Sequence, residues 1–167
     1  MGRHTPKVPI FRARKAFVIF SRKSDYGLRA LIFLSERRDT GPVTLSEIAE
    51  RLMIPKAFLS KILQQLAKRG IVKSLKGPSG GFVLAGDPKA LNVRDIITDI
   101  DGPMRVFECF ANEKDCALYD DCLILDVFQR VEEEIGKVLA GYTLADFHFP
   151  PGVTTAGPAA KGNGRHS

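Results

Sequence analysis

The chain contains no tryptophan, only three tyrosines and three cysteines, and no long hydrophobic run. No stretch approaches the roughly 18–20 apolar residues of a membrane span. Residues 16–20 are apolar, but Arg and Lys flank them on both sides and the stretch is too short for a secretory signal. The cysteines are odd in number and close together, which argues against a secreted disulfide framework. We therefore expect a cytoplasmic protein that does not enter a membrane.

Recognisable catalytic motifs are also missing. The sequence offers no Ser/His/Asp set, no phosphate-cradling Gly-rich loop and no pair of catalytic carboxylates. The three histidines, His4, His148 and His166, lie in or beside the two ends of the chain. The sequence therefore gives no support to an enzyme.

Charge is divided unevenly along the 167 residues. Residues 1–86 hold 17 Lys and Arg against 5 Asp and Glu, whereas residues 87–167 hold 8 against 14. These balances of +12 and −6 add to the net charge of +6. The front half favours a polyanionic partner, because Lys and Arg that neutralise phosphates release condensed counterions. An acidic membrane surface would attract the same charge, so the sign alone does not select nucleic acid.

Periodic apolar residues and capping residues predict a helix-turn-helix. Ser24 can cap a first helix. Residues 44–47, Thr-Leu-Ser-Glu, match the capping box that starts a second helix. Pro55 suits the first position of a third helix that runs to about Arg69. Two short helices joined by a tight turn are typical of DNA-binding proteins, although any amphipathic helix pair in an all-α core shares the pattern.

A β-hairpin is predicted directly after the third helix. Residues 71–75 and 82–84 have the composition of strands, and residues 76–81 have that of a Gly-rich turn. A hairpin in this place is a wing, so we expect a mainly α fold with a small β-hairpin wing, a winged helix-turn-helix. The residues expected to contact base edges, phosphates or the minor groove lie at the start of the third helix and at the wing tip: Lys56, Ala57, Phe58, Ser60, Lys61, Lys76 and Ser79.

A long helix is predicted from about residue 121. Its apolar residues Ile124, Phe128, Val131, Ile135 and Val138 alternate in steps of four and three. This 3.5 spacing is typical of a helix that pairs with its copy in a homodimer. The same row of residues could instead pack onto its own domain. A dimer also suits a two-fold DNA site.

The three cysteines form the second candidate site. Six residues separate Cys109 from Cys116, and five separate Cys116 from Cys122. Thiolates suit iron-sulfur clusters, zinc or copper(I), but structural zinc sites usually use closer pairs and no His lies in this segment. The spacing leaves a cluster, free buried thiols and a redox disulfide open.

Several stretches together resemble one family. They are residues 24–31 (SDYGLRAL), the helix-turn-helix over 43–72, the wing residues 76–82, the three cysteines and residues 141–146 (GYTLAD). In this order, across about residues 20–147, they resemble the bacterial redox-sensing winged-helix regulators, the family of IscR and NsrR, nearer the nitric-oxide-sensing NsrR subgroup. The resemblance implies a dimeric repressor with a 2Fe-2S or 4Fe-4S cluster, whose DNA affinity changes when the cluster is damaged or lost.

The same resemblance implies the ligands of that cluster. Cys109, Cys116 and Cys122 would be three of them. Members like IscR use a His three residues after the last cysteine, where this chain has Leu125. Members like NsrR use an Asp of the first helix, supplied by the partner subunit, and Asp25 matches that position. A carboxylate at a helix start is also stabilised by the helix dipole by ~0.3–1 kcal/mol, and both interpretations of Asp25 can hold together.

These predictions divide the chain into five parts. We expect a basic flexible extension over 1–20, the winged helix-turn-helix over 21–103, a cysteine cluster-binding loop over 104–122, the dimerisation helix and its end over 123–147, and a disordered tail over 148–167. The expected partners are a double-stranded DNA operator and a second copy of the chain. A regulator of the same fold without a cluster, responding to a protein or small molecule, is the alternative.

Overall fold

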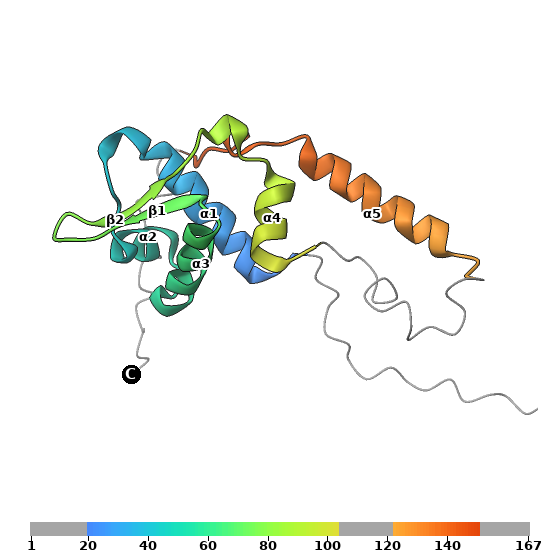
Figure 1. Ribbon diagram of the computed structural model, residues 1–167, viewed down its shortest axis with the longest axis horizontal. Coiled ribbons are helices and arrows are strands. Elements are labelled where there is room, and N and C mark those ends of the chain that lie inside the picture. The colour runs from blue at the N-terminus through green and yellow to red at the C-terminus, as the bar shows by residue number, and fades with distance from the viewer. Residues whose placement is uncertain (1–19, 104–121, 151–167) are drawn as a thin grey trace, which may run out of the picture.

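A computed structural model describes residues 20–103 and 122–150 (Figure 1). The predicted extension, most of the cysteine segment and most of the tail lie outside these ranges. Seven helices and strands and three 3-10 turns follow one another along the described residues. In chain order they are α1 (Arg22–Glu36), η1 (Arg38–Thr40), α2 (Leu45–Leu52), α3 (Lys56–Lys68), β1 (Val72–Leu75), β2 (Gly81–Leu84), η2 (Pro88–Ala90), α4 (Val93–Asp101), α5 (Leu125–Ala140) and η5 (Leu144–Asp146).

The core lies between α1, α2, α3 and α4. Apolar residues at helical spacing put one face of each helix inward, and the largest side chains there are almost fully buried. This set comprises Leu31, Phe33, Leu34, Ile48, Leu59, Ile62, Leu63, Leu66, Ile96 and Ile100. Gly27 lets α1 approach α4 closely, because a Cβ there would lie 2.4 Å from Ile100 Cδ1. We call residues 20–103 with residues 141–150 the body.

The hairpin follows α3 as expected. Strands β1 and β2 are antiparallel, with Val72 opposite Leu84 and Leu75 opposite Gly81. An isolated bridge also pairs Val43, in the segment before α2, with Phe82. The winged helix-turn-helix and its mainly α fold class are confirmed.

Helix α5 leads away from the body (Figure 1). Gly136 is its one buried residue, and a Cβ there would meet the Arg94 guanidinium at 3.5 Å. After α5 the chain returns to the body, where Leu144 is fully buried and its N–H donates to the carbonyl of Leu91 (2.9 Å). Helix α5 is therefore attached to the body near its C-terminal end. No described helix has the length and apolar character needed to cross a bilayer.

Four predicted details differ from the structure. Ser21, and not Ser24, caps α1: the Ser21 hydroxyl accepts from the N–H groups of Lys23 and Ser24, whereas Ser24 lies within the helix and its buried hydroxyl donates to Asp101 (2.5 Å). Pro55 is the N-cap of α3, one residue before the predicted place. Helix α5 begins at Leu125, about four residues later than expected, with no side-chain cap at Ile124. Phe149, within the predicted tail, is half-buried against the core, and its N–H donates to the Glu36 carboxylate (2.7 Å).

Candidate nucleic-acid interface

The turn between α2 and α3 fixes the angle of the third helix. The Thr44 hydroxyl accepts from the Glu47 N–H (3.2 Å), which is the predicted cap of α2. Met53 closes α2 with a left-handed backbone (φ +53°), and Ile54 turns back into the core with its N–H on the Ala49 carbonyl (3.0 Å). This short connection presents the start of α3 to solvent.

Most of the predicted contact residues on α3 are exposed. Lys56, Ala57, Phe58 and Lys61 face solvent, and Ser60 is half-buried. These five residues offer three kinds of chemical group. The lysine ammonium groups suit phosphates, the serine hydroxyl suits base edges, and the phenylalanine ring suits thymine methyl groups.

Two of these side chains are held in place by other elements. Lys56 Nζ donates to Ser46 Oγ on α2 (2.6 Å). The Phe58 ring meets the Tyr26 ring of α1 edge-to-face, with 5.8 Å between centroids. Sequence reasoning missed the contact with Tyr26, because no local pattern links residues 32 positions apart. The start of α3 is thus supported from both α1 and α2.

The wing is held close to the helix-turn-helix by glycine. Val43 and Phe82 exchange two backbone hydrogen bonds (3.0 and 2.8 Å). A Cβ at Gly81 would lie 2.5 Å from the Val43 carbonyl oxygen, so the bridge requires glycine there. Lys76 and Ser79 are exposed at the tip beyond this anchor.

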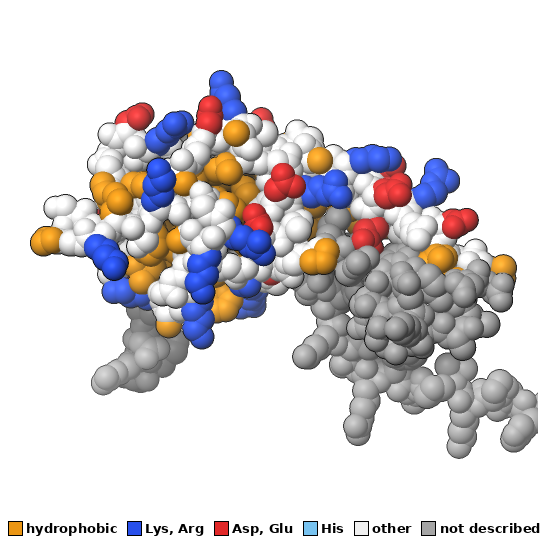
Figure 2. Space-filling view, viewed as in Figure 1, with side chains coloured by type: hydrophobic (Ala, Val, Ile, Leu, Met, Phe, Trp, Pro, Cys, Tyr) orange, Lys and Arg blue, Asp and Glu red, His pale blue; other side chains and the backbone are white. Residues whose placement is uncertain are grey.

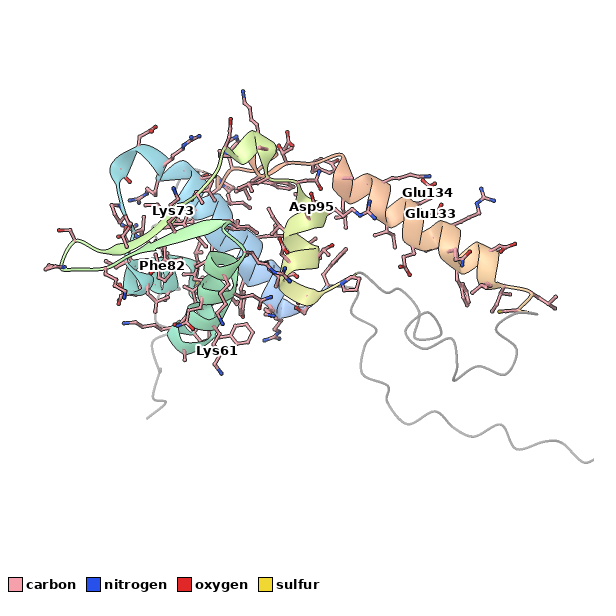
Figure 3. The ribbon with its side chains drawn as sticks, viewed as in Figure 1. Lys61, Lys73, Phe82, Asp95, Glu133 and Glu134 are labelled. Carbon is pink, nitrogen blue, oxygen red and sulfur yellow. The ribbon has the colours of Figure 1, made fainter. Side chains whose placement is uncertain are left out.

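The charged residues of α3 and the hairpin have one sign. Residues 51–86 contain seven Lys and Arg and no Asp or Glu. Figure 2 shows Lys and Arg side chains over α3 and the hairpin, and Figure 3 places Lys61 on α3 and Lys73 on β1. The labelled acidic residues Asp95, Glu133 and Glu134 lie on α4 and α5. Helix α3 and the wing therefore present a positive surface suited to phosphates, whereas α2 carries Glu47 and Glu50.

The structure does not bring the predicted cluster ligands together among the residues it describes. Cys109 and Cys116 lie outside the described ranges. Cys122 is free and half-buried just before α5. Asp25 lies in the first turn of α1, where its Oδ1 accepts from Arg29 Nε (2.8 Å) with its side chain about half exposed. No group of three or more potential metal ligands occurs within the described part of the chain.

Comparison with known proteins assigns this architecture to a family. A family model named Rrf2, described as an iron-dependent transcriptional regulator, matches residues 20–148. The chain belongs to the Rrf2 family. The regulator NsrR of Bacillus licheniformis is 33% identical over 74% of this chain and 87% of its own. IscR of Yersinia enterocolitica is 32% identical over 74% of this chain and 75% of its own.

A solved structure supports the same assignment. CymR, the global cysteine regulator of Bacillus subtilis, is 30% identical and has a TM-score of 0.60 over 76% of this chain and 93% of its own. These Rrf2-family relatives are transcriptional regulators, so the chain is a DNA-binding transcriptional regulator of this family and not an enzyme. The identities to NsrR, IscR and CymR are similar, so they establish the family and no subgroup.

Proposed function

We propose that this Rrf2-family regulator is a homodimeric, sequence-specific repressor in the bacterial cytoplasm that senses nitric oxide or redox and iron status through an iron-sulfur cluster. The observation that supports DNA binding most strongly is the charge of residues 51–86, which include α3 and the hairpin and contain seven Lys and Arg and no Asp or Glu. The exposed start of α3 enters the major groove, and the wing tip with Lys76 and Ser79 contacts the phosphates beside it.

Homodimerisation is supported by the apolar row on α5. Ile124, Val131 and Val138 are 52%, 40% and 63% exposed, whereas Phe128 and Ile135 of the same row are half-buried, so a large part of this apolar row is open to a second surface. A surface cavity on this helix is lined by Val127, Val131 and Ile135 together with the charged residues Arg130 and Glu134. We infer that a second copy of α5 covers this row, which gives the protein the two-fold symmetry of a palindromic site.

The cluster proposal depends on the chemistry of the donor set. Three thiolates, from Cys109, Cys116 and Cys122, and one carboxylate suit iron, and the family model is described as iron-dependent. When bound, a cluster would supply a centre that reacts with nitric oxide or oxygen. Asp25 would be the fourth ligand, supplied across the dimer, and this role requires its ion pair with Arg29 to open. Leu125 cannot ligate iron, which favours Asp25 and the nitric-oxide signal.

A cluster-free regulator is the second candidate. The observation that favours it is the likeness to CymR, whose name describes regulation by or of cysteine and mentions no iron. The Asp25–Arg29 ion pair is also complete without a metal. The two candidates share the fold and the DNA surface and differ in what the cysteines do.

One experiment with two readouts tests these proposals on anaerobically purified protein. Native mass spectrometry and visible absorbance should show a cluster on the wild-type chain. A colourless, iron-free protein that still binds its operator would refute the cluster and leave the cluster-free regulator.

The second readout is the affinity for an operator selected from random duplexes. Lys61→Ala should weaken binding by about tenfold, roughly 1.4 kcal/mol, and should flatten the salt dependence if Lys61 contacts a phosphate. Lys89→Ala removes the same charge from η2, so it is the matched control and should change little. Equal affinities for the Lys61→Ala variant and the wild type at moderate salt would contradict the proposed orientation of α3.

A further inference from the structure

The C-terminal end of α4 is a junction of three helices. Gln65 of α3 donates through Nε2 to the carbonyls of Asp99 (2.6 Å) and Ile100 (3.0 Å). Lys23 of α1 donates through Nζ to the same Ile100 carbonyl (2.6 Å). Arg69, just after α3, pairs with the Asp99 carboxylate (3.3 Å). The recognition helix and α1 therefore share one acceptor atom on α4.

The first turn of α1 is fixed to the same end of α4. The hydroxyls of Ser21 and Ser24 donate to the Asp101 carboxylate (2.7 and 2.5 Å), and Ser24 is only 1% exposed. Asp25, the candidate fourth ligand, is the next residue along the chain. Gly102 then ends α4, and the segment that contains the first two cysteines begins at residue 104. The junction thus lies where the cysteine segment leaves the body.

Helix physics explains why donors gather at this place. The last carbonyls of an α-helix have no partner within the helix, and the negative end of its dipole favours cations and N–H donors. Gln65 fulfils that need from the side of α3, next to the buried face formed by Ile62 and Leu66. The ion pair between Arg69 and Asp99 contributes little to the stability of this junction, because the Arg69 side chain is 59% exposed. The two bonds of Gln65 are the stronger polar link from α3 to α4.

The neighbouring glutamine shows that this contact is specific to one position. Gln64 is exposed and donates to Ser60 within its own helix (3.2 Å). The side-chain amide of Gln64 therefore forms a hydrogen bond within α3, whereas that of Gln65 joins α3 to α4. The chain thus supplies its own matched control.

We propose that Gln65 is a positioning residue that couples the cysteine segment to the recognition helix, an inference that rests on the proposed function. A change in the cysteine segment that shifts the end of α4 would move the Asp99 and Ile100 carbonyls. Because Gln65 donates to both, α3 would follow and change the angle at which Lys61 meets DNA. The affinity then changes without loss of any residue that contacts DNA.

The test is Gln65→Met, which keeps the size and helix propensity of the side chain and removes its donors. Operator affinity is measured for the full chain with its cluster and after chelator treatment. We expect the operator affinities of the two states to differ by at least tenfold in the wild type. In Gln65→Met they should differ by less than about threefold, because the shift of α4 is no longer transmitted to α3. Gln64→Met should keep the wild-type ratio even if it lowers both affinities. Gln65→Lys restores a donor and should restore the ratio.

A second readout needs no cluster. In the cluster-free protein, hydrogen exchange at the amides of the last turn of α4 should accelerate about fivefold in Gln65→Met, the effect of one net hydrogen bond, and should not change in Gln64→Met. If Gln65→Met kept the wild-type ratio of operator affinities with and without the cluster, the coupling through Gln65 would be wrong and the cluster switch would still stand. If the wild-type chain bound its operator equally well with and without the cluster, both the switch and the coupling would be wrong.

Discussion

In the body, the apolar faces of α1, α3 and α4 meet one another, and Ile62, Leu66 and Ile100 are at most 2% exposed. In α5, an apolar row of the same regularity is only partly covered: Ile124, Val131 and Val138 are exposed, Phe128 and Ile135 are half-buried, and the one buried residue of the helix is Gly136. Both regions obey the same rule of helical spacing. They differ in how far the described residues cover the apolar face, which is almost complete in the body and partial along α5.

The two regions also differ in polar contacts. The described hydrogen bonds between distant residues concentrate where α1, α3 and α4 meet and where the chain returns after α5. Along α5, Glu134 and Lys137 form a local ion pair (2.7 Å) that is exposed on both sides. The contacts between distant residues hold the body in one shape, whereas the sparse described contacts along α5 fit our proposal that this helix meets a second copy of the chain.

The largest expected effect concerns the apolar row on α5. Val131→Asp places a carboxylate in the middle of the apolar row, and two-fold symmetry would put two such charges together in a buried seam. We expect dimerisation to weaken by at least about 100-fold, roughly 2.8 kcal/mol, in sedimentation equilibrium. The body should keep its circular dichroism spectrum, because Val131 makes no contact with its core.

The control for this prediction lies on the opposite side of the same helix. Gln129→Asp introduces the same carboxylate at an exposed position outside the apolar row and should leave the dimer unchanged. A Val131→Asp chain that still dimerises like the wild type would show that another surface joins the copies.

The next effect concerns the body, at the backbone contact that joins the wing to Val43. Gly81→Ala places a Cβ 2.5 Å from the backbone oxygen of Val43, and backbone cannot move aside as a flexible side chain can. We expect a loss of about 1–3 kcal/mol in urea unfolding, the usual cost of overpacking. Gly86→Ala is the matched control, because its Cβ would meet only the tip of Leu91 at 4.0 Å. Equal stability of the two variants would mean that the bridge from Val43 to Phe82 opens at little cost.

The features that sequence predicts well are local. The Thr44 cap depends on Glu47 three residues later, and the hairpin depends on a continuous run of 13 residues from β1 to β2. Both patterns lie within one short window, so spacing alone determines them. Ser24 shows where this fails. Ser21 and Ser24 are both good caps, both hydroxyls donate to Asp101, 80 and 77 residues later, and Ser21 is the one that accepts from the N–H groups of Lys23 and Ser24.

The features that sequence does not predict are those in which two distant segments meet. Nothing near Gln65 distinguishes it from Gln64, because the difference is made by the end of α4, 34 residues away. Gly81 looks like an ordinary turn glycine until Val43 is placed beside it. For the candidate site, the sequence yields the donor types but not their assembly, since the predicted fourth ligand would come from another subunit.

The smallest effect concerns the link between the two regions. Asp146 accepts hydrogen bonds from the N–H (2.7 Å) and hydroxyl (2.9 Å) of Thr143, and these bonds hold the pKa of its carboxyl below the usual value. The folded state therefore binds its proton less readily than the unfolded state. The resulting stability is present above the ordinary pKa of Asp and is lost as pH falls through the lowered one.

Asp146→Asn should therefore narrow the difference in melting temperature between pH 6 and pH 3, with little change at pH 6, because the amide oxygen can still accept from Thr143. Differential scanning calorimetry at the two pH values measures this. Asp39→Asn alters an exposed carboxylate of η1 without hydrogen bonds among the described residues, so it should keep the wild-type difference. If Asp146→Asn kept that difference as well, the turn that attaches α5 to the body would be held by the buried Leu144 and not by its cap.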